Sequence, residues 1–323
     1  MGQTSGRRRA HLDNAPPFNS VSPSVTTMHR VLTLNQSLAV VFALLTAVTN
    51  AVALTTQHIA STRKQEHASH WRLVLFLFRQ PLWLLGWLAL CGSLVFQALA
   101  LHFGPMSEVQ PLLVSELIVA LLLRRLWLRQ NIATLAWLSA GVTVIGLAVF
   151  LIASSPGGRA NVPRASQWTA PVLACLVVTA ILVGVAQRGS PSRRAGFFAA
   201  ATGVMWALEA TFIKATTDTI TTSGFVGALA HWPVYALVVG GIVGLLCEQA
   251  ALHVGPLKVS QPFIVIVDPV VSVVLGLWLY RESLQGGFVH VSVATLAFIV
   301  MCVGVVLLTQ SAPSTMKAEL HRL

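Results

Sequence analysis

Long apolar segments separated by short polar stretches dominate the chain. Nine of them are long enough to cross a bilayer as helices, because a crossing takes about 20 residues. A further segment at residues 71–83 is bounded by Arg72, Arg79 and Pro81 and is too short to span alone, so it is predicted to lie at the interface. If it also crosses, the number of spans is ten. The predicted spans are 35–57, 83–103, 107–123, 131–153, 168–187, 195–213, 232–253, 259–280 and 287–309.

The composition agrees with this pattern. Apolar residues make up 55% of the chain and charged residues only 10%, with a mean hydropathy of +0.75. These values lie outside the range of soluble globular domains. We therefore expect an all-α, polytopic membrane protein in the cell membrane. The net charge of +11 comes without an aromatic-interleaved basic patch, so nucleic acid is not expected as a partner.

Two halves of the chain repeat each other. The sequence ALHFGP at residues 100–105 recurs as ALHVGP at 251–256, an offset of 151 residues, and the match continues to residues 128 and 279. It aligns residue types that a shared apolar composition would not align, including histidine, glutamine, proline and tryptophan. The other matching segments are 42–55 with 198–211 and, more loosely, 144–151 with 302–309.

The repeat predicts the architecture. Spans 1 to 4 match spans 6 to 9, and a shift of five spans is odd, so each copy crosses the membrane opposite to its partner. An inverted repeat of this kind is typical of secondary transporters, whose substrate site lies between the halves. The predicted organisation is a disordered tail (1–33), a first repeat (34–154), a loop with linker helix 5 (155–194), a second repeat (195–310) and a C-terminal tail (311–323).

Lys and Arg residues orient the chain. Loops 1-2, 3-4, 5-6 and 7-8 carry eleven of them and the opposite loops carry four, of which Lys214 and Arg281 are two. The positive-inside rule therefore places the C-terminus in the cytoplasm. The tail's own Arg7, Arg8 and Arg9 argue for the opposite orientation, though less so if translation starts at Met28. A start at Met28 also gives a signal-peptide-like beginning.

The segment PLWLLGWLAL at 81–90, followed by ALHFGPMSEVQPLLVSELIVALLL at 100–123 and a second copy of the latter, resembles the drug/metabolite transporter (DMT) superfamily, most closely its branch related to NIPA-like magnesium transporters. The resemblance covers nearly all of residues 34–310. It implies an inverted-repeat carrier for a small molecule or ion. NIPA-like proteins tend to carry a Gly-Glu pair where this chain has Gly92 and Ser93, so magnesium is kept as the alternative cargo.

Four acidic residues lie within predicted spans, where a charge costs about 2.5–3.5 kcal/mol at a helix centre. Such residues either hydrogen-bond a neighbouring helix or face a watery cavity, where they bind a cation or relay a proton. These candidates for ion or substrate binding are Glu116, Glu209, Glu248 and Asp268.

Prolines at matching depth in the two halves are a second signal. Proline removes a backbone hydrogen bond and frees a carbonyl, and broken helices mark midplane binding sites in transporters. Pro111 and Pro262 each follow a glutamine, Gln110 or Gln261, and Pro269 directly follows Asp268. The prolines are candidate kinks, and the glutamines are candidate hydrogen-bond partners of the cargo. The alternative is a packing kink without chemistry.

Two charged residues are expected to matter less. Lys214 is predicted to extend its ammonium group to the membrane interface. Glu282 follows the eighth span in a loop, and its charge is expected to be dispensable.

No enzyme or cofactor motif is present: the chain has no phosphate-binding Gly-x4-Gly-Lys-Ser/Thr sequence and no Ser-His-Asp, zinc or paired-carboxylate pattern. We expect secondary or passive transport, no enzymatic activity and no cofactor, with a small molecule or cation as substrate and the lipid bilayer as environment. The alternatives that stay open are a magnesium transporter, a membrane-embedded transferase, and a scaffold or assembly subunit without transport. A homodimer also stays open, as does the identity of any metal.

The orientation can be tested with reporters. A reporter fused after Leu323 should report the cytoplasm, and one inserted at Ser155 should report the exterior, because the odd number of spans separates these positions. Topology reporters active on only one side of the membrane make this measurement. Both reporters on the same side would contradict nine spans.

Overall fold

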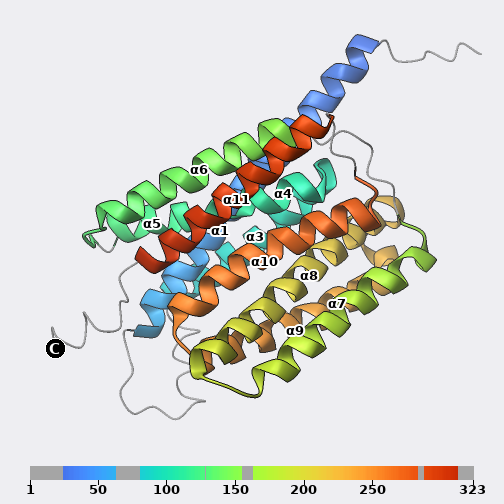
Figure 1. The fold of residues 1–323 in the computed structure, drawn as a ribbon. Helices are drawn as coiled ribbons and strands as arrows, with labels where there is room; N and C mark the ends of the chain where they lie inside the picture. Colours follow the sequence, from blue (N-terminus) through green and yellow to red (C-terminus); the bar gives the residue numbers. More distant parts are fainter. Residues whose placement is uncertain (1–24, 63–80, 128, 155–162, 283–286, 312–323) are drawn as a thin grey trace, which may run out of the picture.

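The structure is a computed structural model that describes residues 25–62, 81–127, 129–154, 163–282 and 287–311 (Figure 1). These residues form helices and their connections, with no strand among them. Nine helical segments in the described ranges are long and apolar enough to cross a membrane. The predicted class, an all-α membrane protein with nine spans, is confirmed.

The first half comprises α1 (Val25–Thr62), α3 (Pro81–Phe103), α4 (Met106–Leu113), α5 (Glu116–Leu126) and α6 (Thr134–Ser154). α7 (Ala165–Ala186) connects it to α8 (Pro191–Ala228), α9 (Trp232–Val254), α10 (Leu257–Leu279) and α11 (Phe288–Ser311). Figure 1 shows the beginning of α1 and the end of α11 at opposite ends of the bundle. An odd number of crossings requires this arrangement.

Some predicted boundaries were wrong. α1 begins at Val25, so residues 25–33 are helical and do not belong to the predicted disordered tail, and residues 1–24 lie outside the described part. The sixth span is not 195–213 but the 38-residue helix α8, which breaks its helical geometry only at Gly224 (φ 74°). The predicted interfacial segment at 71–83 falls mostly outside the described residues.

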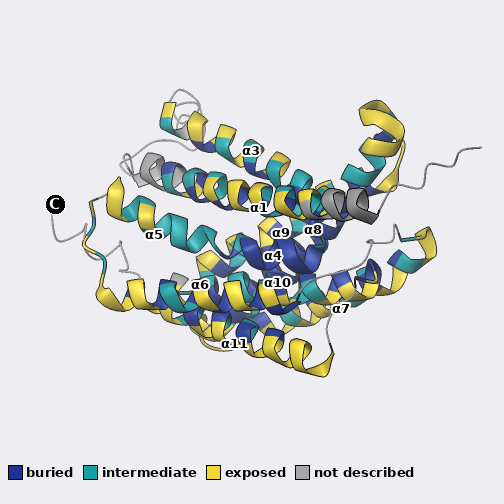
Figure 2. Cartoon of the chain, turned by 90° about the horizontal axis from the view of Figure 1, so that it is seen from above, coloured by how far each residue is buried: buried dark blue, intermediate teal, exposed yellow. Residues whose placement is uncertain are grey.

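The burial pattern is that of a bundle in lipid. Large apolar side chains on the outer helices face outward; Leu88 on α3, for example, is 70% exposed. The interior belongs to α8 and to the short helix α4, on which every residue from Met106 to Leu112 is buried. Figure 2 shows α4 in dark blue at the middle of the bundle, surrounded by partly exposed helices.

The recurring Gly-Pro turn has a packing role that is the same in both halves. A Cβ on Gly104 would lie 2.5 Å from the Cβ of Ala39 on α1, and a Cβ on Gly255 would lie 2.7 Å from the Cβ of Ala195 on α8. Ala39 and Ala195 are equivalent at the offset of 156 that relates the first helices of the two halves. Each half therefore packs its turn against its own first helix in the same way.

The two halves meet in a reciprocal contact between α6 and α11. A Cβ on Gly146 would lie 2.6 Å from the backbone nitrogen of Met301, and a Cβ on Gly304 would lie 2.7 Å from that of Thr143. At the offset of 158, Gly146 corresponds to Gly304 and Thr143 to Met301. The same contact thus occurs twice with the partners exchanged, as a two-fold axis requires.

The other helix contacts follow the same symmetry. α1 packs on α3 as α8 packs on α9, and α4 of the first half meets α10 of the second, its own counterpart. Because equivalent helices run in opposite directions, the axis lies across the helices and hence in the membrane plane. The inverted repeat inferred from the sequence accounts for the fold.

The α6–α11 crossing should tolerate no added methyl group. Gly146→Ala and Gly304→Ala place a Cβ against backbone atoms that cannot rotate away, so each should lower stability by about 1–3 kcal/mol through overpacking. Thermal unfolding of the purified protein in detergent micelles measures the effect. Gly141→Ala on α6 is the matched control, because a Cβ there meets nothing within 4 Å. Equal unfolding temperatures for Gly146→Ala and Gly141→Ala would contradict the close approach.

Candidate functional site

The third span consists of two helices, α4 and α5, which meet shortly after Pro111. α4 ends at Leu113 and α5 begins at Glu116. Four short-range hydrogen bonds hold the backbone at this junction, each from an N–H to the carbonyl three residues earlier; the donors are Val114, Ser115, Leu117 and Ile118. In the second half, α10 continues as one helix through Pro262 and Pro269. The break is therefore a property of the first half alone.

The four acidic residues predicted from the sequence come from four different helices. Glu116 opens α5, Glu209 lies on α8, Glu248 on α9 and Asp268 on α10, and all four are partly buried. Their carboxylates lie within range of mutual repulsion: Glu116 with Glu248 and Asp268, and Glu209 with the same two. We call these four residues the acidic cluster. The fold brings together residues that are up to 152 positions apart.

The cluster is held by neutral partners. The Asn50 side chain on α1 donates to the carboxylate of Glu116, and the Ser272 hydroxyl donates to Asp268 Oδ1 at 3.1 Å. Within the described residues, no lysine or arginine forms an ion pair with any of the four carboxylates. Their negative charge is therefore not balanced by the protein's own cations.

Small residues make room for the cluster. A Cβ on Gly241 of α9 would lie 3.0 Å from Glu209 Oε1. A Cβ on Gly203 of α8 would lie 2.7 Å from Val267 and 3.0 Å from the backbone nitrogen of Asp268. α8 thus approaches α9 and α10 closely where the acids meet.

The two glutamines are placed differently. Gln110 is buried on α4, and its Nε2 has no hydrogen-bond partner, whereas Gln261 is half-buried on α10.

No group of three His, Cys, Asp or Glu side chains in the described part of the chain could hold a metal ion.

A second charged centre, which the sequence did not reveal, surrounds the turn between α3 and α4. Lys214 on α8 donates from Nζ to the carbonyl oxygens of Leu101 at 2.7 Å and Gly104 at 2.9 Å. Its ammonium group also lies 5.3 Å from the ring centre of Tyr280, whose hydroxyl donates to the Thr211 carbonyl at 2.9 Å. The prediction that Lys214 reaches the membrane interface was wrong, because the residue is only 4% exposed.

Glu282 holds the other side of the same turn. Its carboxylate accepts the backbone N–H groups of Met106 at 2.7 Å and Ser107 at 2.9 Å, the first two residues of α4. The chain turns back after α10 through Arg281, at a φ of 51°, and Gly276 lacks the Cβ that would meet Glu282 Oε2 at 2.5 Å. The expectation that Glu282 is dispensable was wrong, since it is buried and doubly bonded. We call Lys214 and Glu282 the turn clamp.

Glu108 is the other buried acid that sequence reasoning missed. It is 4% exposed, accepts from the Gln36 side chain at 3.4 Å, and has its second oxygen, Oε2, without a partner. Its position just inside the third span could have marked it as a candidate. However, acids are common in the first turn of a helix, where the helix dipole stabilises a negative charge, so the position alone does not indicate a site. Glu282 offered no such signal, because its partners lie 175 and 176 residues away.

The turn clamp should contribute strongly to stability. Lys214→Met leaves two buried carbonyl oxygens without their donor, and each buried polar group left unsatisfied costs about 1–3 kcal/mol. Gly276→Ala keeps both charges but displaces the Glu282 carboxylate, so it should also destabilise the protein. Thermal unfolding in detergent tests both. Arg281→Gln, a neighbouring exposed position, is the control and should change stability by less than about 0.5 kcal/mol. A Lys214→Met protein as stable as this control would refute the clamp.

Comparisons with known proteins give one relative. A protein of Corynebacterium glutamicum described as uncharacterized is 28% identical over 291 residues, which cover 88% of this chain and 98% of the relative. No family model matches the sequence, and no solved structure matches it. The chain is thus similar over most of its length to nearly the whole of another protein whose function is not described.

Proposed function

We propose that this protein is a secondary membrane transporter of the DMT type, which moves a small metabolite, a drug-like compound or a cation across the membrane. The observation that carries this proposal is the acidic cluster: four partly buried carboxylates from both halves of the bundle, without a basic partner among the described residues. A scaffold or assembly subunit does not require four acidic residues close together inside its helix bundle.

The charge of the cluster suggests how transport is coupled. Four ionised carboxylates in one region of a membrane protein repel one another, and a bound proton or cation relieves that repulsion. Asn50 and Ser272 hydrogen-bond the carboxylates but bring no charge. The cluster is therefore suited to bind and release a positive charge during a transport cycle.

The architecture supports the same proposal. An inverted repeat lets the two halves exchange conformations, so that a site between them is open first to one side and then to the other. The junction of α4 and α5 lies directly before Glu116, so one acid of the cluster stands where the third span changes from one helix to the next. The resemblance of residues 81–90 and 100–123 to DMT carriers agrees with this arrangement.

The cargo can be identified by uptake into proteoliposomes. The purified protein is supplied with divalent cations, amino acids or cationic drugs, with and without a pH gradient. Accumulation that requires the gradient supports proton-coupled transport, whereas uptake of magnesium alone supports the alternative of a magnesium transporter. A reconstituted, folded protein that moves none of these would favour a scaffold.

Asp268→Asn tests the site. The substitution keeps the shape and removes only the charge, so coupled transport should be lost while folding and membrane insertion persist. Transport in proteoliposomes, with the unfolding temperature as a check on folding, makes the measurement. Ser272→Ala is the matched control: it removes the hydrogen bond to Asp268 but leaves the carboxylate, and it should retain most activity. Full transport by Asp268→Asn at every pH would remove this residue from the mechanism.

A further inference from the structure

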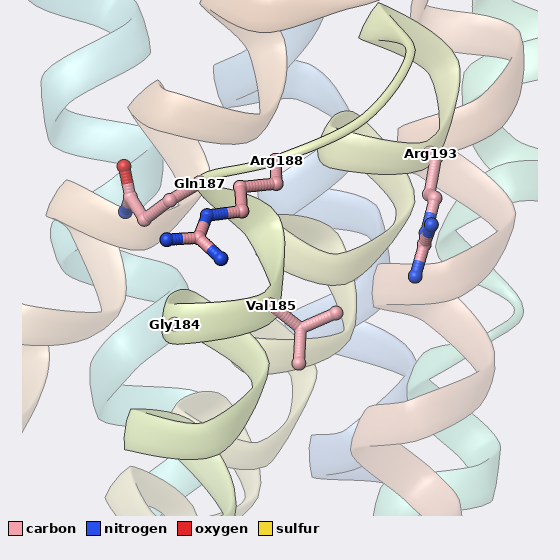
Figure 3. A pocket seen from close by; sticks show the side chains of 5 residues that line it. All are labelled: Gly184, Val185, Gln187, Arg188 and Arg193. Atoms are coloured by element: carbon pink, nitrogen blue, oxygen red, sulfur yellow. The ribbon is translucent and has the colours of Figure 1, made fainter.

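A pocket of about 580 Å³ lies at the turn between α7 and α8. It is lined by Gly184, Val185, Gln187, Arg188 and Arg193 (Figure 3). Figure 3 shows the Arg188 and Arg193 side chains on either side of Val185. In this view the Arg188 side chain extends away from Arg193, and both arginines line the same pocket together with Val185.

The turn itself is well fixed. Gly189 adopts a φ of 112°, and a Cβ there would lie 3.1 Å from Cδ of Arg193, so the backbone passes close to that side chain. Ser190 begins α8, and its hydroxyl accepts the backbone N–H of Arg193 at 3.4 Å. A third arginine, Arg194, donates from Nε to the carbonyl of Ala186 at 3.1 Å. Arg194 therefore serves the fold.

Unlike Arg194, the guanidinium groups of Arg188 and Arg193 do not hold the turn through a hydrogen bond to its backbone. Both are exposed, and within the described residues no carboxylate lies in ion-pair range of either one. The Arg193 guanidinium lies 5.5 Å from the ring centre of Phe197, a contact that orients the group without neutralising it. Two positive charges and their hydrogen-bond donors are thus available to an anion.

The surface beside the pocket favours one kind of anion. α7 presents large apolar side chains to the outside along its length, among them Leu173 at 54% exposure, Val177 at 54% and Ile181 at 58%. Val185 continues this apolar face to the pocket itself. A soluble anion uses only the arginines, whereas an amphiphile with an anionic head and acyl chains uses both the arginines and the apolar face.

We propose that this pocket binds the headgroup phosphate of an anionic phospholipid, with Arg188 and Arg193 holding the phosphate and the outer face of α7 contacting the acyl chains. Arginine binds phosphate through paired, charge-assisted hydrogen bonds, and basic pockets at the ends of membrane helices are suited to anionic headgroups. The loop belongs to the face that the positive-inside rule assigns to the cytoplasm, where anionic lipids are enriched. The site does not depend on the proposed transport function.

Native mass spectrometry of the intact protein in detergent tests the site. Phosphatidylglycerol should remain bound more tightly than phosphatidylcholine with the same acyl chains, because choline adds a positive charge. Arg188→Gln and Arg193→Gln should each weaken phosphatidylglycerol binding by about tenfold, the loss expected for one charge-assisted contact. Both side chains are exposed, so the variants should fold, and the unfolding temperature without lipid verifies this.

The control is Arg164→Gln, an exposed arginine at the other end of α7. It removes the same charge and should leave the binding of phosphatidylglycerol unchanged. Inorganic phosphate is the third arm: if it binds as tightly as the lipid, the site takes a soluble anion and the lipid proposal is wrong. Equal affinity of the wild type and the double variant Arg188→Gln, Arg193→Gln for phosphatidylglycerol would also overturn it.

Discussion

The turn between α3 and α4 places free backbone carbonyl and N–H groups inside the bundle, and the rest of the structure depends on how they are satisfied. Lipid and packed helices offer no water, so each unsatisfied group costs several kcal/mol. Lys214 binds the carbonyls at the end of α3, and Glu282 binds the N–H groups at the start of α4. Both side chains come from the second half, so the two halves are locked together at this end.

The repeat is symmetric in its packing and asymmetric in its charges. The glycine contacts of the Gly-Pro turns and of α6 with α11 recur in both halves, because they depend on backbone shape. The turn clamp has no counterpart at the second Gly-Pro turn: among the described residues, no charged side chain hydrogen-bonds the backbone at Gly255 and Pro256. The two Gly-Pro turns thus share their packing but differ in the hydrogen bonds that charged side chains of the described residues make to them.

Two groups of charged residues inside the bundle, the turn clamp and the acidic cluster, have different partners. Lys214 and Glu282 each make two hydrogen bonds to backbone groups of the turn between α3 and α4, so their role is structural. Among the described residues, Glu116, Glu209, Glu248 and Asp268 have only neutral partners and one another nearby, and it is to these four that the proposed transport function assigns a proton or a cation. Burial does not separate the turn clamp from the acidic cluster, because both are largely removed from water. The hydrogen-bond partners of each charged side chain do separate them.

The sequence by itself determined the membrane class, the nine spans, the repeat and the four acids of the cluster, because apolar length, internal similarity and charge within a span are local properties of the chain. Only the tertiary structure decided which backbone groups needed a partner and which side chain reached them. Lys214 resembled an interfacial lysine and Glu282 a loop acid, since their partners lie more than 100 residues away. The prolines are a second feature that the sequence alone could not decide: one helix ends shortly after Pro111, whereas α10 continues through Pro262 and Pro269. Proline weakens a helix wherever it occurs, but the neighbouring helices determine whether the helix ends there.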